Sequence, residues 1–463
     1  MKRSNKPLTI QLKKTLGCIS LLCGSLLSGV ANSDEAANLE ITPSELNTAI
    51  KQISRNIRDI YVIEDDGKKM ADYIVERHAA GTYQGLDARA FADKLTADMV
   101  DISNDLHMYM RYDPESASSP APQRRMNEED MNEAEREEMR QFQSMMRQRA
   151  LDKNYGAMNF QWLPNNVAVI HISQWFELAL LKSNLDSMMT LAEDADAIIF
   201  DTRSNPGGSP DGIRYLQGHF LDKEIEMMEF RNRVDNQVMN SPSMMDIDGE
   251  KRVGVPMYIL VDSNCASACE DFAMTTKDNG FGTVVGEQTA GAGFMNRYVP
   301  IIDTFNLSIS FAGAFSIASG NNWQGVGVTP DVNVIAPDAL DTAYKLILQD
   351  KLKNATEDRE RQGLQKRINW LEEKLAAKPV ISLENYAGTY RGTSDDDRTV
   401  SVEGRYLKLT GGRRPVYFKP VAAGIFEQTP HANMRVSFDL KGDKIASLKL
   451  HRAQGEALSF PRI

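Results

Sequence analysis

Between Met158 and Ala336, short uninterrupted apolar runs alternate with stretches of helical pattern. A run that does not alternate with polar residues suits a strand covered on both faces, because each face then meets other protein. The pattern therefore predicts an α/β core, which we place over residues 154–338. The runs are Val167–Ile170, Ala197–Phe200, Met257–Val261 and Val284–Val285.

A helical domain is predicted before the core, over residues 34–112. Thr42 is a capping residue, Pro43 suits the first helical position, and Glu45 stands at the third, which together form a helix start signal. Apolar residues then recur at spacings of three and four, the stripe of an amphipathic helix. They are Leu46, Ile50, Ile53, Ile57 and Ile60.

Residues 113–153 are rich in Pro and Ser at first and strongly charged afterwards. This predicts a flexible loop followed by an exposed helix with a thin apolar stripe. Two interpretations stay open: a solvated surface insertion, or a lid whose adaptable methionines touch substrate. The stripe consists of Met131, Met139, Phe142 and Met146.

After the core, residues 339–380 predict a helical linker, with Leu364, Ile368, Leu371 and Leu375 on one face. Over residues 381–463 apolar and polar residues alternate, as in Thr399–Val402 and Tyr406–Leu409. Glycine-containing turns separate these alternating segments. The last region therefore predicts a small antiparallel β-barrel.

The first 33 residues differ from the rest, with five basic residues before or beside an apolar run, Leu16–Val30, and small residues up to Ser33. This is typical of a secretory signal peptide cut after Ser33. A membrane anchor is the alternative, but about 20 apolar residues are needed to cross a bilayer. We expect an exported protein, periplasmic or extracellular, with no transmembrane segment once the signal is removed.

The formal net charge is −11, which argues against nucleic acid as a partner, because phosphates require basic patches.

Two of the four cysteines leave with the signal, and Cys265 and Cys269 remain. An oxidising compartment permits a disulfide. We expect two buried free thiols instead, because the start of a helix would hold these side chains too rigidly for bridging.

Two loops carry residues suited to chemistry. The strand ending at Phe200 runs into Asp-Thr-Arg-Ser-Asn-Pro-Gly-Gly (201–208), where backbone N–H groups can face a ligand. The strand ending at Val261 is followed by a turn with Ser267 among small residues at the start of a predicted helix. Small neighbours leave room for substrate, and a helix N-terminus favours developing negative charge. Ser267 is therefore a candidate nucleophile.

These segments resemble the tail-specific protease and interphotoreceptor retinoid-binding protein superfamily, whose pattern is Asp-x-Arg-x-Asn-x-Gly-Gly followed by Ser-Ala-x-Glu. Residues 286–291 and 325–331 match two further motifs, and the resemblance covers about 300 residues. It implies an α/β core of the tail-specific protease (ClpP/crotonase-like) type. Too few residues separate His107 from Asn154 for the peptide-binding PDZ module of the processing proteases, so we expect none.

The resemblance also implies which residue is the general base that activates Ser267. Processing proteases use a lysine in Thr-x-Gly-Lys-Gly, but this chain has Ala292 there. In the branch similar to the tricorn core, a histidine from the N-terminal side activates the serine, and His107 fits that position. Gln324 stands where a glutamate is expected; glutamine can orient an imidazole but cannot stabilise its positive charge. Asp105 is a candidate substitute, and the alternative is that it only caps a loop.

The oxyanion hole implied by the resemblance is formed by N–H groups of Gly207 or Gly208 and of Ala268. Asp201 and Arg203 are interpreted as a structural ion pair that shapes the loop. The other histidines are scattered without metal-ligand spacing, and no dinucleotide or phosphate fingerprint is present. We therefore expect neither a metal nor another cofactor.

The sequence supports two candidate functions, one as an enzyme and one as a binding protein. The first is a serine endopeptidase that hydrolyses polypeptides through a Ser267 acyl-enzyme, with His107 as general base. The alternative is a catalytically weak or inactive carrier of apolar ligands or peptides on the same fold. The C-terminal barrel resembles the lipocalin-like modules of exported bacterial hydrolases and suits either function. Oligomeric state and cleavage preference are left open.

Overall fold

The computed structural model describes most of the chain. The described residues are 40–114, 133–379, 381–392, 397–412, 414–432, 434–442, 444–452 and 457–463. The predicted signal peptide, residues 1–33, lies outside them, as does Met131 of the charged segment. None of the helices in these ranges has a stretch long and apolar enough to cross a bilayer.

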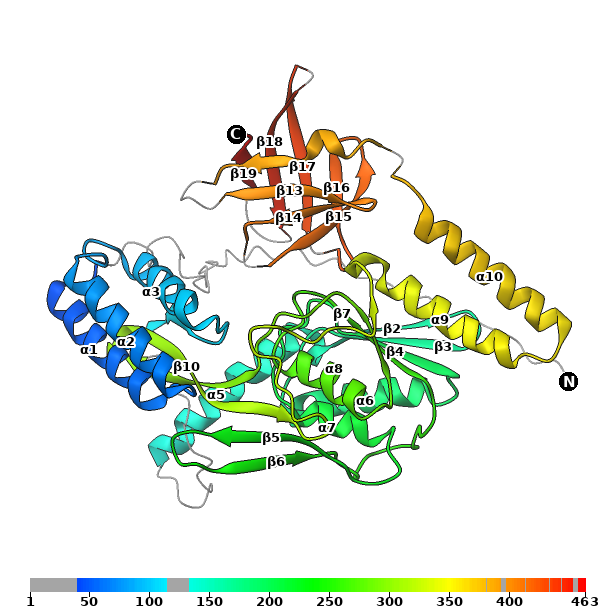
Figure 1. The fold of residues 1–463 in the computed structure, drawn as a ribbon, viewed down its shortest axis with the longest axis horizontal. Coiled ribbons are helices and arrows are strands. Elements are labelled where there is room, and N and C mark those ends of the chain that lie inside the picture. Colours follow the sequence, from blue (N-terminus) through cyan, green and yellow to red (C-terminus); the bar gives the residue numbers. More distant parts are fainter. Residues whose placement is uncertain are drawn as a thin grey trace, which may run out of the picture.

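A six-stranded sheet forms the centre of the molecule, in the order β11-β8-β7-β4-β3-β2. Neighbouring strands from β3 to β11 run parallel, and β2 pairs antiparallel with β3. The four strands predicted from apolar runs are confirmed (Figure 1). The strands are β2 (Ala157–Leu163), β3 (Val167–Ile172), β4 (Ala197–Asp201), β7 (Met257–Val261), β8 (Thr283–Gly286) and β11 (Val332–Asn333).

Both faces of this sheet are covered, which explains the uninterrupted apolar runs. Ile198 and Phe200 pack in one hydrophobic cluster with α6 (Leu178–Leu191), α7 (Asp211–Gly218) and α8 (Ala268–Asp278). Ala197 and Ile199 point the other way, into a cluster with α9 (Ala339–Asn354) and α10 (Asp358–Ala376). The segment predicted as a helical linker is thus one outer layer of the core, with Leu364, Ile368 and Leu371 buried.

A second, antiparallel sheet has the order β1-β10-β5-β6, and β9 also pairs with β10. Its long strand β10 packs under the N-terminal helices, so that Ile53, Phe91 and Leu307 share one core. The predicted capping box is confirmed, because Thr42 N–H donates to Glu45 and Glu45 N–H to Thr42. The elements are α1 (Pro43–Ile60), α2 (Glu64–Ala79), α3 (Ala88–Ser103), β1 (Tyr109–Tyr112), β5 (Glu226–Asn232), β6 (Val238–Pro242), β9 (Phe294–Ile301) and β10 (Phe305–Ser316).

Within the charged segment, α5 spans Glu133–Leu151. Its described side chains are largely exposed, with Met145 at 45% exposure and Met146 half-buried. This agrees with the predicted exposed helix. The choice between a solvated insertion and a lid stays open, and so do the predicted domain boundaries.

The C-terminal region forms an eight-stranded antiparallel sheet in which each strand pairs with the next in sequence. A bridge between Tyr390 and Arg462 brings the first and last strands together, so the sheet is a nearly closed barrel with its own apolar core. The strands are β12 (Gly388–Tyr390), β13 (Arg398–Glu403), β14 (Tyr406–Thr410), β15 (Val416–Ala422), β16 (Ile425–Thr429), β17 (Met434–Lys441), β18 (Lys444–Arg452) and β19 (Leu458–Pro461).

The barrel lies beside the carboxyl ends of the parallel strands, above the core in Figure 1. His431, between β16 and β17, stacks on His171 at the end of β3, with ring centroids 3.9 Å apart. Asp201 and Arg203 line the same small cavity. Burial lowers the pKa of His171 to about 4, against the opposing effect of Asp201, and burial also lowers the pKa of His431.

This junction predicts acid sensitivity. The pKa of His171 is lower in the folded state than in the unfolded chain, so between about pH 6.5 and 4 the unfolded chain binds more protons. Stability is therefore lost as the pH falls through that window, by about 3 kcal/mol at most. His171→Phe keeps a stacking ring without a titrating nitrogen, and its melting temperature should fall less between pH 7 and 4.5.

The matched control is His451→Phe, at an exposed position of the barrel. It should follow the wild-type pH dependence. Parallel melting curves for the wild type and His171→Phe would contradict the assignment of acid sensitivity to this pair.

Candidate active site

Ser267 stands at the turn between β7 and α8, with φ 57° and ψ −120°. A positive φ is unfavourable for a residue with a side chain and persists only where the surroundings hold it. Part of this support comes from Asp262, a buried residue at the start of the turn. Its Oδ1 accepts N–H groups of Ser204, Asn264 and Cys265 at 2.9, 3.0 and 2.9 Å.

The fully buried carboxylate of Glu270 holds the turn from the other side. Its Oε2 accepts the N–H of Ser267 and the N–H of Ala292, both at 2.8 Å. Its Oε1 accepts the hydroxyl of Thr289 and the N–H of Gly291, both at 2.6 Å. Burial raises the pKa of Glu270, and these four donors act in the opposite direction. One side chain thus connects the serine turn to residues 289–292.

Glu270 is the glutamate of the Ser-Ala-x-Glu pattern, to which the sequence alone assigns no role. The available signal was its position, three residues after Ser267, where an acidic side chain can reach back to the N-cap N–H. Its additional bonds to the loop after β8 involve residues about 20 positions away and carry no local sequence signal.

Cys265 and Cys269 form a disulfide, so the prediction of free thiols is wrong. The prediction assumed that both residues belong to the rigid start of the helix. Cys265 instead lies in the turn, since α8 begins only at Ala268, and the two Cα atoms are 5.4 Å apart. That separation is within the range a disulfide spans. Ser267 and Ala268 are therefore enclosed by a covalent loop.

The glycine-rich loop after β4 lies directly against this turn. A methyl group added to Gly207 would come within 2.8 Å of Ser267 Cβ and 2.9 Å of Ala268 N. The N–H of Gly207 donates to Asn205 Oδ1 at 2.8 Å. Among the described residues, the N–H groups of Gly208 and Ala268 have no acceptor. These two N–H groups are therefore the ones available to a developing oxyanion.

Asp201 and Arg203 form a buried ion pair at the base of the same loop, with Nε to Oδ1 at 2.8 Å. Arg203 also donates to the carbonyl of Ala336 at 2.6 Å. Although burial alone would raise it, the pKa of Asp201 is held well below its usual range by the guanidinium. The pair is buried on both sides, which agrees with a role in shaping the loop.

His107 lies in the loop between α3 and β1 and is half-buried. Its backbone N–H donates to Asp105 Oδ1 at 2.9 Å. The ring atom Nδ1 and the carboxylate atom Asp105 Oδ2 are both buried without a partner among the described residues. Burial lowers the pKa of His107, and the Asp105 carboxylate acts against this. No hydrogen bond joins the ring to Ser267 in the described part of the chain.

Gln324 connects the loop after β8 to the segment that precedes His107, through bonds to main-chain groups of both. Its Oε1 accepts the N–H of Gly293 at 2.8 Å, and its Nε2 donates to the carbonyl of Asn104 at 3.1 Å. Gly293 follows Ala292, which is bonded to Glu270, and Asn104 lies three residues before His107. A role of Gln324 in orienting the imidazole stays a prediction, as do the catalytic roles of His107 and Asp105.

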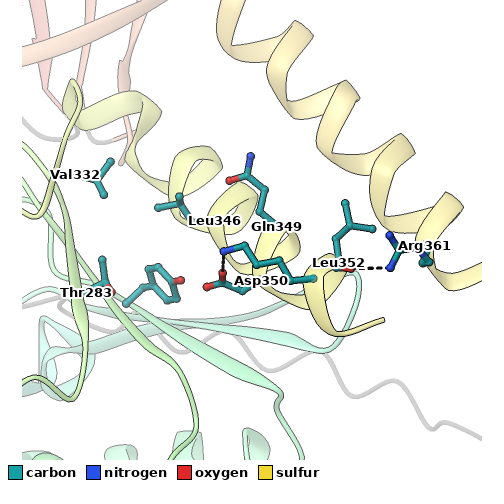
Figure 2. A pocket seen from close by; sticks show the side chains of 9 residues that line it. Thr283, Val332, Leu346, Gln349, Asp350, Leu352 and Arg361 are labelled. Atoms are coloured by element: carbon teal, nitrogen blue, oxygen red, sulfur yellow. Dashed lines mark hydrogen bonds and ion pairs between the residues drawn. The ribbon is translucent and has the colours of Figure 1, made fainter. Parts of the chain in front are cut away.

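A cavity of about 630 Å³ lies elsewhere, between α9, α10 and the core sheet (Figure 2). It is lined by Tyr258 and Thr283, which stand at the amino ends of β7 and β8. Ser267 follows the carboxyl end of β7, so the cavity is at the opposite edge of the sheet. Ligands of parallel sheets bind at the carboxyl edge, and we assign this cavity no part in the chemistry.

Residues 166–334, which contain the serine turn and the glycine-rich loop, match the profile of peptidase family S41. The match covers the motifs that carry the resemblance found in the sequence, and it confirms that resemblance over these residues.

Among individual proteins, the chain is 32% identical over 140 residues to a carboxy-terminal-processing protease of Bartonella bacilliformis, covering 30% of this chain and 31% of the relative. It is 27% identical over 183 residues to the carboxy-terminal processing protease CtpA of Bacillus subtilis, covering 39% and 37%. The matched part is about a third of each relative's length. A lipoprotein structure from Streptococcus agalactiae aligns with a TM-score of 0.46 and 13% identity, over 68% of this chain and 99% of that one.

The bonds of Glu270 predict a sharp effect of a small substitution. Glu270→Gln turns an acceptor of two N–H groups into a donor facing donors, which should cost about 2–4 kcal/mol of stability. The displaced turn should slow reaction of Ser267 with an active-site probe by about 100-fold. Glu373→Gln, the same change on the exposed face of α10, is the control. Equal melting temperatures and labelling rates in both variants would refute this role.

Proposed function

We propose that this protein is an exported serine peptidase that hydrolyses polypeptides through an acyl-enzyme on Ser267. The observation that carries the proposal is the position of Ser267 on a positive-φ turn beside two N–H groups that have no acceptor. A hydroxyl presented next to such donors suits attack on a carbonyl whose oxygen becomes negative. The names of the relatives support polypeptide substrates.

In the proposed reaction, His107 takes the Ser267 proton while Oγ bonds to the substrate carbonyl carbon. The N–H groups of Gly208 and Ala268 receive the oxyanion. His107 then gives the proton to the leaving amine as the C–N bond breaks. In the second half, the same imidazole deprotonates a water that attacks the acyl carbon, and it returns that proton to Ser267 as the Oγ–C bond breaks and the acid leaves. Nε2 is the ring atom assigned to these transfers, because Nδ1 is buried.

Asp105 is the proposed partner of the imidazolium. Its carboxylate already accepts the backbone N–H of His107. The second carboxylate oxygen and the ring atom His107 Nδ1 are both buried without a hydrogen-bond partner among the described residues. Burial, with a further contribution from the Asp105 carboxylate, raises the pKa of Tyr61. A carboxylate here would stabilise positive charge on the ring, which Gln324 cannot do.

We also propose the ClpP/crotonase-like type for the core, supported by the parallel order of β3, β4, β7 and β8 with helices on both faces. Export is supported by the basic and apolar pattern of residues 1–33.

The alternative function is a carrier of apolar ligands or peptides on the same fold. The observation in its favour is that His107 and Ser267 are not hydrogen-bonded among the described residues. A serine without an activating base is a weak nucleophile and would remain inert.

A fluorophosphonate separates these functions, because only an activated serine reacts with it quickly. We expect labelling on Ser267, and loss of labelling and peptide hydrolysis in Ser267→Ala at an unchanged melting temperature. Ser263→Ala, in the same segment, is the control and should be labelled normally. Absence of labelling across the pH range, together with tight binding of an apolar ligand, would favour the carrier.

The role of Asp105 is tested by the pH profile of kcat/KM. Because its carboxylate raises the pKa of His107, Asp105→Asn should move the acidic limb to lower pH and lower the maximum by at least about tenfold. His107→Ala should cost about a thousandfold. Asp101→Asn, exposed on α3, is the control. A profile that only decreases, with no shift of its acidic limb, would leave Asp105 as a purely structural residue.

A further inference from the structure

We propose that the C-terminal barrel positions the catalytic turn, through Arg414 and Pro415 on the loop between β14 and β15. Arg414 Nη1 donates to the carbonyl of Asn264 at 2.6 Å, and Asn264 Nδ2 donates to the carbonyl of Pro415 at 3.0 Å. Asn264 is three residues before Ser267. This inference rests on the proposed peptidase function, and it makes the barrel part of the active site's support.

Asn264 transmits this contact because it is buried and has little freedom. Only 8% of its surface is exposed, and its N–H is bonded to Asp262 on the core side. Its carbonyl points to the barrel, where Arg414 is its donor. A buried carbonyl that loses its donor is unfavourable, so the turn would move to satisfy it.

The barrel also contacts the second loop of the site. The hydroxyl of Tyr417 on β15 lies within hydrogen-bond distance of two carboxylates, those of Glu287 and Glu403, and donates its one hydrogen between them. Glu287 is two residues before Thr289, where the loop begins to donate to Glu270. The two loops that Glu270 connects on the core side are therefore both held by the barrel on the outside.

The turn needs such support because Ser267 has a positive φ, which relaxes when neighbours release it. From the core side, Ala266 N–H donates to Asn205 at 3.1 Å and the disulfide closes the turn. Neither of these fixes the Asn264 carbonyl. A displacement of about 1 Å at a nucleophile is enough to slow a reaction substantially.

Arg405 provides a matched control at the same interface. Its Nη2 donates to Asp338 Oδ1 at 2.8 Å, just before α9. It fixes the barrel to the core without touching the catalytic turn. Loss of Arg405 should weaken docking, whereas loss of Arg414 should disturb the serine.

The experiment compares full-length Arg414→Ala, Arg405→Ala and Arg414→Lys with the wild type. Arg414→Ala should lower the fluorophosphonate labelling rate and kcat by about tenfold with little change in KM. Arg414→Lys, which keeps a donor, should recover part of this. Arg405→Ala should stay within about twofold of the wild type even where its melting temperature falls.

Hydrogen exchange of the amides of residues 265–269 gives a readout independent of activity. Exchange should be faster in Arg414→Ala than in Arg405→Ala. If Arg414→Ala does not fold, Tyr417→Phe, which removes only a hydroxyl, replaces it. Wild-type labelling and exchange in a folded Arg414→Ala, or equal loss in Arg405→Ala, would overturn the proposal. An unlabelled wild type would refute the peptidase function, while the exchange comparison would still test the barrel contact.

Discussion

The buried carboxylate of Glu270 is the interaction on which the site depends. Four donors meet it, one from the serine turn and three from the loop after β8. Burying a charge is unfavourable unless hydrogen bonds compensate it, so the carboxylate and its donors can only be satisfied together. The positions of Ser267 and Ala292 are in this way fixed by the same group.

The parallel sheet brings this group and its neighbours to one edge. The loop after β4 supplies Gly208, the turn after β7 supplies Ser267, and the loop after β8 supplies Ala292. Gln324 then extends the contacts to Asn104, in a segment more than 200 positions away. The site therefore combines a local geometry, set by the sheet, with a contribution from the N-terminal helical region.

Much of this was predictable from the sequence because it is periodic or local. Uninterrupted apolar runs identified β3, β4, β7 and β8, and the Thr42 to Glu45 pattern located the start of α1. The glycine-rich loop and Ser267 were identified by motif, and the family match covers both.

The remainder depends on contacts that sequence patterns do not encode. Three such contacts join distant segments. They are the bonds of Gln324 to two main-chain groups, the stack of His171 on His431, and the packing of α9 and α10 on the sheet. The disulfide was missed for a different reason: Cys265 lies three positions before the first residue of α8, and element boundaries are the least certain part of a sequence-based prediction.

The order of the barrel in the chain has a consequence for biosynthesis. Arg414 follows Asn264 by 150 positions, which at about 5–20 residues per second corresponds to roughly 8–30 s of translation. During that interval a nascent chain already contains the serine turn but lacks its outer contacts. The hydroxyl of Ser267 is thus synthesised before the groups that support its turn, so a truncated product released before residue 414 carries Ser267 without the barrel that borders it.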